Sequence, residues 1–510
     1  MAFNSAAVVA CSPLSIPSPV LFGAEILSLE ANQVNDFSRT VGFGLYANHG
    51  AVDVQAANIC NVSIAYTHPG QNDKVKVQMF LPTKDWNGRM QAIGGNGWQT
   101  GLNLVALAGM EAAIGEGYAS LSTDSGLGTS DSPTWGLLSP GNTNRYLLQN
   151  LASTSLNDLS ILGKDRVNSY YGTPPVFSYW NGCSQGGRQG MMLAQRFPEA
   201  FDGIVASAPA INWSELFVGD LWPYILMNTM KTFPRPCEMQ AITQAAVTAC
   251  DGNDGLVDGL ITEPDDCAFD PTTLVGTTIQ CTEIGRNVTI SMGASILTQA
   301  IWEGPMGSSN SSLFPGPKKC TTLSSTDATS GGTIALTTCS SNGTCVAAPL
   351  PLLTPWVRKF VLKDESVDLS KLTRGDFERL LHASVNEYSS VLDTNDPDLS
   401  AFRARGGKIV GYHGLRYFNN VTELGPNIHD FYRMFFSPGL GHCFGGNGAY
   451  PADTFDAMRS WVENGTAPDV LNATFVGTTR LVKRTLCPYP LKQTYDGVGN
   501  ATEDEGFSCK

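Results

Sequence analysis

A glycine-flanked serine is the first feature of this chain that could do chemistry. The motif Gly182-x-Ser184-x-Gly186 follows the apolar run 176–180 and precedes a helical stretch. A sharp turn between a strand and a helix exposes a serine hydroxyl for nucleophilic attack, and glycines flank the serine because side chains would clash there. We therefore predict Ser184 as a nucleophile and the N–H of Gln185, which opens the helix, as an oxyanion donor. An ordinary glycine-rich turn is the alternative.

Two further stretches offer the partners that such a serine needs. Residues 93–98 (IGGNGW) contain three glycines, which let the backbone of Gly95 approach a substrate carbonyl as a second oxyanion donor. A tight turn with no role is the alternative. The base is expected late in the chain, and His442 lies in the glycine-rich stretch 438–446 (PGLGHCFGG), so we predict it as the general base. His413 ends a strand, and we expect it to shape a loop. The remaining histidines are expected to be structural or exposed: His49, His68, His382 and His429.

Cysteines lie next to both predicted catalytic residues. If Ser184 and His442 are within hydrogen-bond reach, Cys183 and Cys443 are forced close together, and a disulfide between them would tether nucleophile to base. Two buried free thiols are the alternative. The chain has 13 cysteines, none in a CxxC pattern. We also expect disulfides at Cys250 and Cys267, Cys339 and Cys345, Cys487 and Cys509, and Cys11 and Cys60. The pairings of Cys237, Cys281 and Cys320 are left open.

Sequons of the type Asn-x-Ser/Thr are dense: Asn61, Asn212, Asn287, Asn310, Asn342, Asn420, Asn464, Asn472 and Asn500. With the many cysteines they indicate a secreted glycoprotein. Residues 1–10 form a poor signal peptide, and we interpret this start as trimmed or mis-assigned rather than as that of a cytosolic protein. The net charge of −14 argues against a nucleic-acid partner, and no apolar run is long enough to span a membrane. The sequence does not reveal the oligomeric state.

The pattern of strands and helices predicts an α/β-hydrolase fold with a large inserted lid domain. Strand-like stretches at 74–81, 90–93, 118–122, 176–180 and 202–208 alternate with helical stretches at 146–162 and 188–196, which favours a mostly parallel sheet. Helical segments such as 377–388 and a Ser/Thr/Gly-rich stretch then intervene before 406–412 resumes the strand pattern. We predict a core made of residues 1–210 and 403–510, with residues 211–402 inserted as the lid.

These stretches resemble the tannase and feruloyl esterase family of fungi and bacteria. The family signature is a Cys-Ser pair, an Asp and a His-Cys pair, with a disulfide joining the two cysteines. Cys183-Ser184 and His442-Cys443 match it, as do residues 179–190 (YWNGCSQGGRQG), and the resemblance runs from Cys11 to Cys509. It implies a secreted serine carboxylic-ester hydrolase of the feruloyl esterase B type, whose lid forms the substrate-binding wall. It also implies action on small or polysaccharide-linked esters of plant phenolic acids.

An acidic stretch in the inserted segment is a candidate metal site. Residues 250–261 (CDGNDGLVDGLI) place three aspartates close together, where they repel one another unless a hard cation such as Ca²⁺ lies between them. The family has a calcium site in its lid, and the resemblance implies side-chain ligands from Asp251, Asp254 and Asp258 and carbonyl ligands from Leu256 and Leu260. The spacing is not that of an EF-hand, and a solvated acidic loop is the alternative. Its distance in sequence from Ser184 favours a structural ion. No organic cofactor is expected.

The resemblance fails at the acid of the triad. In the family an Asp follows the strand that ends in His-Gly, in a pattern like His-Gly-x-x-Asp, whereas Tyr417 occupies that position here. Three explanations stay open: a coding stretch missing from the sequence, a substitute acid such as Glu423 or Asp430, or an inactive relative. We favour the first, because the sequence on both sides looks normal. Without its acid a triad turns over about 10⁴ times more slowly, so weak esterase activity is expected of the chain as written.

Several functions compete at this point. Hydrolysis of feruloyl esters is our first choice and hydrolysis of galloyl esters, as by a tannase, is the runner-up, because the motifs do not separate them. A non-catalytic module that binds carbohydrate or phenolic groups is the second hypothesis, supported only by the missing acid. A peptidase is the third hypothesis, supported only by the fact that serine peptidases use the same catalytic residues. A lipase is a further alternative, but it would need an amphipathic flap that the sequence does not show.

Overall fold

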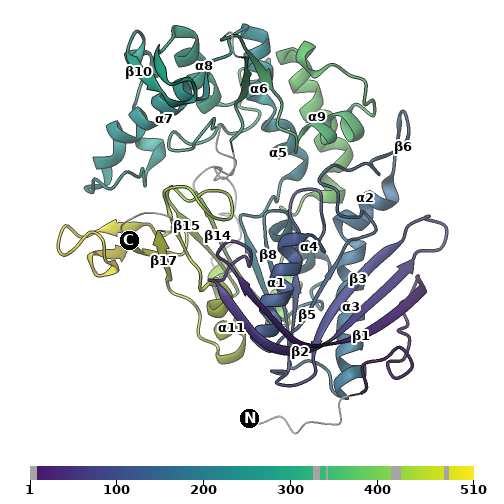
Figure 1. Cartoon of the computed structure of the whole chain (residues 1–510). Coiled ribbons are helices and arrows are strands. Elements are labelled where there is room, and N and C mark those ends of the chain that lie inside the picture. The colour runs from purple at the N-terminus through teal and green to yellow at the C-terminus, as the bar shows by residue number, and fades with distance from the viewer. Residues whose placement is uncertain (1–8, 326–332, 341–342, 415–426, 476–481) are drawn as a thin grey trace.

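A nine-stranded sheet forms the centre of the molecule, in the order β1-β2-β3-β5-β4-β8-β9-β14-β15 (Figure 1). The computed structural model describes residues 9–325, 333–340, 343–414, 427–475 and 482–510. The strands of this sheet are β1 (Glu25–Val41), β2 (Val52–Thr67), β3 (Val75–Pro82), β4 (Arg89–Ile93), β5 (Ala119–Thr123), β8 (Phe177–Cys183), β9 (Gly203–Ser207), β14 (Lys408–Gly414) and β15 (Tyr432–Ser437). Within the described residues, no helix is both long and apolar enough to cross a bilayer.

The expected parallel arrangement is confirmed in the half of the sheet that carries the predicted site. From β5 to β15 each strand is parallel to its neighbour, so their carboxyl ends meet at one edge, where α/β proteins bind ligands. Strands β1 to β3 extend the sheet in antiparallel fashion, and β3 also runs antiparallel to β5. The sequence pattern missed β1, because this strand is exposed along most of its length and so lacks a regular apolar alternation.

Helices cover both faces of the sheet. Helices α1 (Leu104–Gly115) and α11 (Thr454–Asn464) pack on one face, and α3 (Thr154–Tyr171) and α4 (Gln185–Arg196) pack on the other, each pair around its own apolar core. The single helical stretch expected over 146–162 is two helices. Helix α2 (Arg145–Ala152) ends at Ser153, whose φ of −156° is not helical, and α3 starts after it.

The segment assigned to the insertion forms a helical layer of its own. Figure 1 shows its helices in teal and green above the sheet. Its elements are α5 (Trp213–Gly219), α6 (Trp222–Met230), α7 (Pro236–Cys250), α8 (Met292–Glu303), α9 (Arg374–Leu392), and the hairpins β10 (Thr278–Cys281)–β11 (Arg286–Thr289) and β12 (Leu336–Cys339)–β13 (Cys345–Ala348). The last helix assigned to the segment, α10 (Ser400–Ala404), packs instead against α4 in the core of the sheet part. Trp213, Trp356 and Phe360 are buried in its core, and Trp98 from the sheet part stacks on Phe360 with ring centroids 5.5 Å apart. The two parts therefore share apolar contacts close to the loop that carries Gly95.

Short strands outside the central sheet complete the fold. Strands β16 (Ala449–Tyr450), β17 (Leu471–Phe475) and β18 (Lys483–Leu486) form one small sheet, β19 (Gln493–Tyr495) pairs with β20 (Phe507–Cys509), and β6 (Leu137–Ser139) pairs with β7 (Asn142–Thr143). Strand β18 matters for the acidic loop described below, because it carries Arg484.

Candidate active site

Ser184 lies on the turn between β8 and α4, with φ of 63° and ψ of −118°. This backbone conformation is strained for a residue with a side chain. A Cβ atom on Gly182 would lie 2.5 Å from the carbonyl carbon of Gly186, and one on Gly186 would lie 3.0 Å from the carbonyl oxygen of Gly95. A side chain at position 182 would therefore collide with the backbone, and one at position 186 would press on the loop that carries Gly95, in agreement with the clash that the elbow pattern predicts.

His442 reaches Ser184 from a loop that follows β15. Its Nε2 lies 2.7 Å from Ser184 Oγ, which is hydrogen-bond distance. The loop is closed by a bond from Gly441 N–H to Gly445 O at 2.9 Å and anchored by Tyr412, whose hydroxyl donates to Cys443 O at 2.8 Å. Ser184 is half-buried and His442 is exposed. The structure thus brings the predicted nucleophile and base together at the carboxyl edge of the sheet.

The disulfide expected between Cys183 and Cys443 is present, with Cα atoms 5.9 Å apart. It joins the residue before the serine to the residue after the histidine. Cys443 has φ of 68°, a left-handed conformation that turns the chain back within the histidine loop. The nucleophile turn and the histidine loop are therefore covalently linked beside the Ser184–His442 hydrogen bond.

The remaining cysteines form a disulfide framework. The other expected pairs are present: Cys11–Cys60, Cys250–Cys267, Cys339–Cys345 and Cys487–Cys509. Of the three cysteines left open by sequence, Cys237 pairs with Cys281, and Cys320 is reduced. Burial raises the pKa of the Cys320 thiol to about 11, so it is not a reactive thiolate at neutral pH.

The two predicted oxyanion donors differ in their present engagement. Gln185 is the first residue of α4, so its N–H has no acceptor inside the helix. The N–H of Gly95 instead donates to Gln189 Oε1 at 3.0 Å. A role for Gly95 in binding an oxyanion stays a prediction. In that role its N–H must either donate to the oxyanion and to Gln189 at once or release Gln189.

Gln189 is a residue near the site that sequence reasoning missed. Its side chain is fully buried, accepts from Gly95 N–H and donates through Nε2 to Thr100 O at 3.0 Å. It therefore holds the loop after β4 against the nucleophile helix. The sequence does hold a signal for this residue. Helix α4 follows one buried strand and precedes another, so its first turns are expected to be apolar, yet they carry several polar residues.

The acidic loop lies close to the histidine loop in space, although far from it in sequence. Leu260 packs against Gly439, where an added Cβ would lie 2.4 Å from Leu260 Cδ2. A small cavity between the two loops is lined by Asp254, Asp258, Leu260, Pro438 and Arg484, among others. The contact runs through Leu260 and Gly439 rather than through His442 itself.

The donor chemistry of this loop fits a hard cation, because it offers carboxylate and carbonyl oxygens. The described conformation is not an assembled cage, however. The Asp251 carboxylate accepts from the N–H groups of Asp258, Gly259 and Leu260 at 3.0, 2.9 and 3.3 Å, and Asp258 Oδ2 accepts from Arg484 Nη2 at 2.6 Å. Burial raises the pKa of Asp258, Arg484 lowers it, and Asp251 and Asp254 raise it by repulsion. Calcium therefore stays a prediction at this loop.

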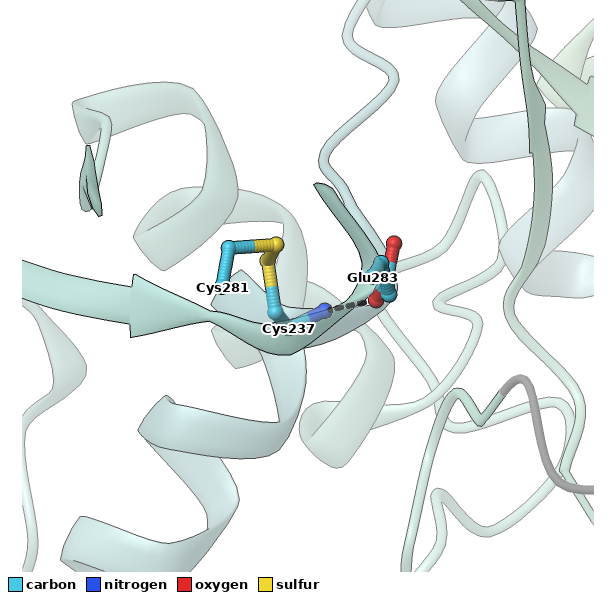
Figure 2. Close-up of side chains that lie close together, drawn as sticks. All are labelled: Cys237, Cys281 and Glu283. Carbon is cyan, nitrogen blue, oxygen red and sulfur yellow. Dashed lines mark hydrogen bonds between the residues drawn. A yellow bond between two sulfur atoms is a disulfide. The ribbon is translucent and has the colours of Figure 1, made fainter. Parts of the chain in front are cut away.

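A second group of possible ligands proves to be structural. Among the described residues, Cys237, Cys281 and Glu283 are the set of three whose potential ligand atoms lie within 4.8 Å of one another. Figure 2 shows that the two sulfur atoms form a disulfide and that Glu283 accepts from the backbone N–H of Cys237, at 2.8 Å. Because a disulfide has no thiolate to offer, this group does not form a metal site.

The position of the missing acid lies outside the described residues, as do Tyr417 and the proposed substitute Glu423. The other substitute, Asp430, belongs to the short turn η7 (Ile428–Asp430) that precedes β15, whereas His442 follows the far end of that strand. Six strand residues span about 20 Å. Asp430 instead pairs with Arg403 at 3.1 Å. The structure therefore does not bring Asp430 to His442.

A serine on a strand–turn–helix elbow, hydrogen-bonded to a histidine at the carboxyl edge of a mostly parallel sheet, defines the α/β-hydrolase class. Within that class, a family model described as tannase and feruloyl esterase matches residues 60–510. The chain belongs to the tannase and feruloyl esterase family, and it is a carboxylic ester hydrolase by that membership.

Similar proteins match along nearly the whole chain. A probable feruloyl esterase of Arthroderma benhamiae is 36% identical over 97% of this chain and 93% of its own length. A tannase of Aspergillus oryzae is 28% identical over 88% of this chain and 84% of its own. The structure of the tannin acyl hydrolase from Aspergillus niger superposes with a TM-score of 0.84 at 26% identity and covers 98% of this chain and 96% of that one.

Proposed function

We propose that this protein is a secreted serine esterase that cleaves esters of plant phenolic acids, with feruloyl esters preferred. The observation that carries the proposal is the 2.7 Å contact between Ser184 Oγ and His442 Nε2, on a nucleophile elbow that a disulfide joins to the histidine loop. A serine hydroxyl is a weak nucleophile until an adjacent base accepts its proton. This pair is the combination that an acyl-enzyme mechanism requires.

In this mechanism His442 Nε2 accepts the hydroxyl proton as Ser184 Oγ attacks the ester carbonyl carbon. The resulting oxyanion accepts a hydrogen bond from Gln185 N–H at the amino end of α4, with Gly95 as the second donor. Collapse breaks the bond to the alcohol, which leaves with the proton from His442. Water then attacks the acyl-enzyme and gives a proton to His442. Collapse releases the phenolic acid as His442 returns that proton to Ser184 Oγ.

The sequence departs from the family pattern at the position of the acid that would orient His442. The sequence has Tyr417 where the family pattern has an aspartate. The acid of a triad holds the imidazole in the productive tautomer and stabilises the imidazolium, and its loss lowers turnover by about 10⁴. If no other carboxylate takes this part, oxyanion stabilisation and substrate binding remain, and the chain hydrolyses esters weakly but measurably.

Feruloyl esters are the preferred substrate class because the 36% identical relative is named a probable feruloyl esterase and covers nearly the whole chain. Galloyl esters are the alternative, favoured by the TM-score of 0.84 to a tannin acyl hydrolase. Secretion is supported by six disulfides. It is also supported by the exposure of the sequon asparagines Asn287, Asn310, Asn464, Asn472 and Asn500.

Two measurements test the proposal together. A fluorophosphonate probe should label Ser184, and the Ser184→Ala variant should not be labelled. Methyl ferulate should be hydrolysed with a higher kcat/KM than methyl gallate. The reverse order of kcat/KM would make the chain a galloyl esterase. Well-folded protein that is neither labelled nor active would identify a binding module instead.

A further inference from the structure

Arg188, four residues after the nucleophile, is a guanidinium with no exposed surface. It sits on α4 and donates through Nη1 to Ala152 O at 3.1 Å and Leu392 O at 3.4 Å, and through Nη2 to Leu151 O at 2.9 Å. Its Nε donates to the side chain of Gln185 at 2.7 Å. A single buried side chain therefore touches the residue after Ser184, a helix of the core and a helix of the inserted segment.

The charge of Arg188 is balanced by helix ends rather than by a salt bridge. Among the described residues it forms no ion pair within 4.0 Å. The carbonyls it binds are the last of α2 and α9, where the helix dipole places partial negative charge. Burial lowers the pKa of Arg188 to about 9, and Asp393 at the end of α9 opposes this. The side chain is thus still a cation at neutral pH.

The contact with Arg188 fixes the orientation of the Gln185 side chain. Because a guanidinium can only donate, the amide oxygen of Gln185 must face it, which turns Nε2 away. Gln185 is 1% exposed, and within the described part of the chain Nε2 has no hydrogen-bond partner. Leaving a buried donor unsatisfied is unfavourable, so the bond to Arg188 holds the side chain in an orientation that it would otherwise avoid.

We propose that Arg188 is a positioning residue, which anchors Gln185 to the carboxyl ends of α2 and α9 and so holds the oxyanion-binding N–H and the inserted segment in one fixed relation. The proposal rests on the proposed function, because it gives Gln185 N–H a part in the reaction. It predicts that Arg188 acts on the chemical step and not only on the stability of the fold.

Arg196 offers a matched control for a purely structural role. It lies on the same helix and also donates to a carbonyl of α9, that of Ser390, but it is exposed and twelve positions after the nucleophile. An arginine that only ties the inserted segment to α4 should behave like Arg196. Loss of such a tie would lower the melting temperature and leave kcat unchanged.

The test compares Arg188→Lys, Gln185→Met and Arg196→Lys for melting temperature, for kcat and KM on methyl ferulate, and for the labelling rate of Ser184 by a fluorophosphonate. We expect Arg188→Lys and Gln185→Met each to lower kcat and the labelling rate by roughly 10- to 100-fold. KM should stay within about twofold, because only binding in the transition state is lost. Arg196→Lys should leave both rates unchanged.

A double variant completes the test. If Arg188 acts through Gln185, the combined Arg188→Lys and Gln185→Met changes lower kcat no further than the worse single change. Rates in Arg188→Lys that match those of Arg196→Lys would overturn the proposal while leaving the proposed function intact. If Arg188→Lys fails to fold, unchanged rates in Gln185→Met overturn it alone. A wild-type chain that the probe does not label would overturn the proposed function, and this proposal with it.

Discussion

Ser184 Oγ and His442 Nε2 meet at 2.7 Å although 258 positions separate them in the chain. The two residues follow β8 and β15, whose carboxyl ends lie at the same edge of the sheet with β9 and β14 between them. The Cys183–Cys443 disulfide is the covalent link between their two loops. Sheet topology brings the loops to one edge, and the disulfide fixes the remaining distance.

Removing that disulfide should lower the catalytic rate by more than the lost stability of the fold accounts for. We expect Cys183→Ser combined with Cys443→Ser to lower kcat on methyl ferulate, and the fluorophosphonate labelling rate, by about 10²-fold, because small misplacements of catalytic groups have effects of that size. Cys237→Ser combined with Cys281→Ser is the control, since it removes a disulfide of the inserted segment. Equal rates in both double variants would contradict a positioning role for the first disulfide.

Local patterns in the sequence predicted the elements that hold the site, and tertiary contacts decided what the sequence left open. The elbow at Ser184 was predictable because strand, glycines and helix are contiguous there. The engagement of Gly95 was not, because its partner Gln189 lies 94 positions away. The approach of Leu260 to Gly439 depends likewise on how the inserted segment folds back on the core.

Asp430 should not serve as the triad acid. It lies before β15, about a strand length from His442, and pairs with Arg403. We expect Asp430→Asn to keep kcat on methyl ferulate within about twofold of the wild type, because this surface ion pair contributes little. Glu423→Gln should lower kcat only if Glu423 is a substitute acid. A large loss of kcat in Asp430→Asn alone, without loss of stability, would show that the histidine loop rearranges in the active protein.

The stability of the inserted segment should depend on the protonation of Asp393. Its carboxylate accepts from Ser214 N–H at 2.8 Å and from Ser214 Oγ at 2.6 Å, and burial raises its pKa from 3.8 to about 6. Because the pKa of Asp393 is raised in the folded state, the contribution of this residue to the free energy of unfolding is fully present below pH 3.8. That contribution is lost as the pH rises through 6. The loss amounts to at most about 3 kcal/mol.

The Asp393→Asn variant isolates this contribution. Urea unfolding gives the free energy of unfolding of both proteins between pH 3.5 and 7. As the pH rises, the wild type should lose up to about 3 kcal/mol of this free energy relative to the variant. Other carboxylates titrate in the same window in both proteins, so their effects cancel. A difference that stays constant with pH would show that Asp393 has an ordinary pKa.

Calcium should stabilise the protein through the acidic loop, and one substitution can show whether it does. Within the described residues the Asp254 carboxylate accepts one local bond, from Leu256 N–H at 3.0 Å, and an asparagine there keeps the acceptor while removing a charge. In a chelator, Asp254→Asn should be neutral or stabilising, within about 0.5 kcal/mol, because Asp251 and Asp258 then repel one neighbour fewer. With calcium, the wild type should gain about 2.7 kcal/mol at a hundredfold excess over Kd, and the variant should gain less. Thermal unfolding with calcium, with magnesium and with chelator measures these differences. A wild type whose melting temperature is the same under all three conditions would show that the loop binds no calcium and is a solvated acidic loop, as in the alternative above.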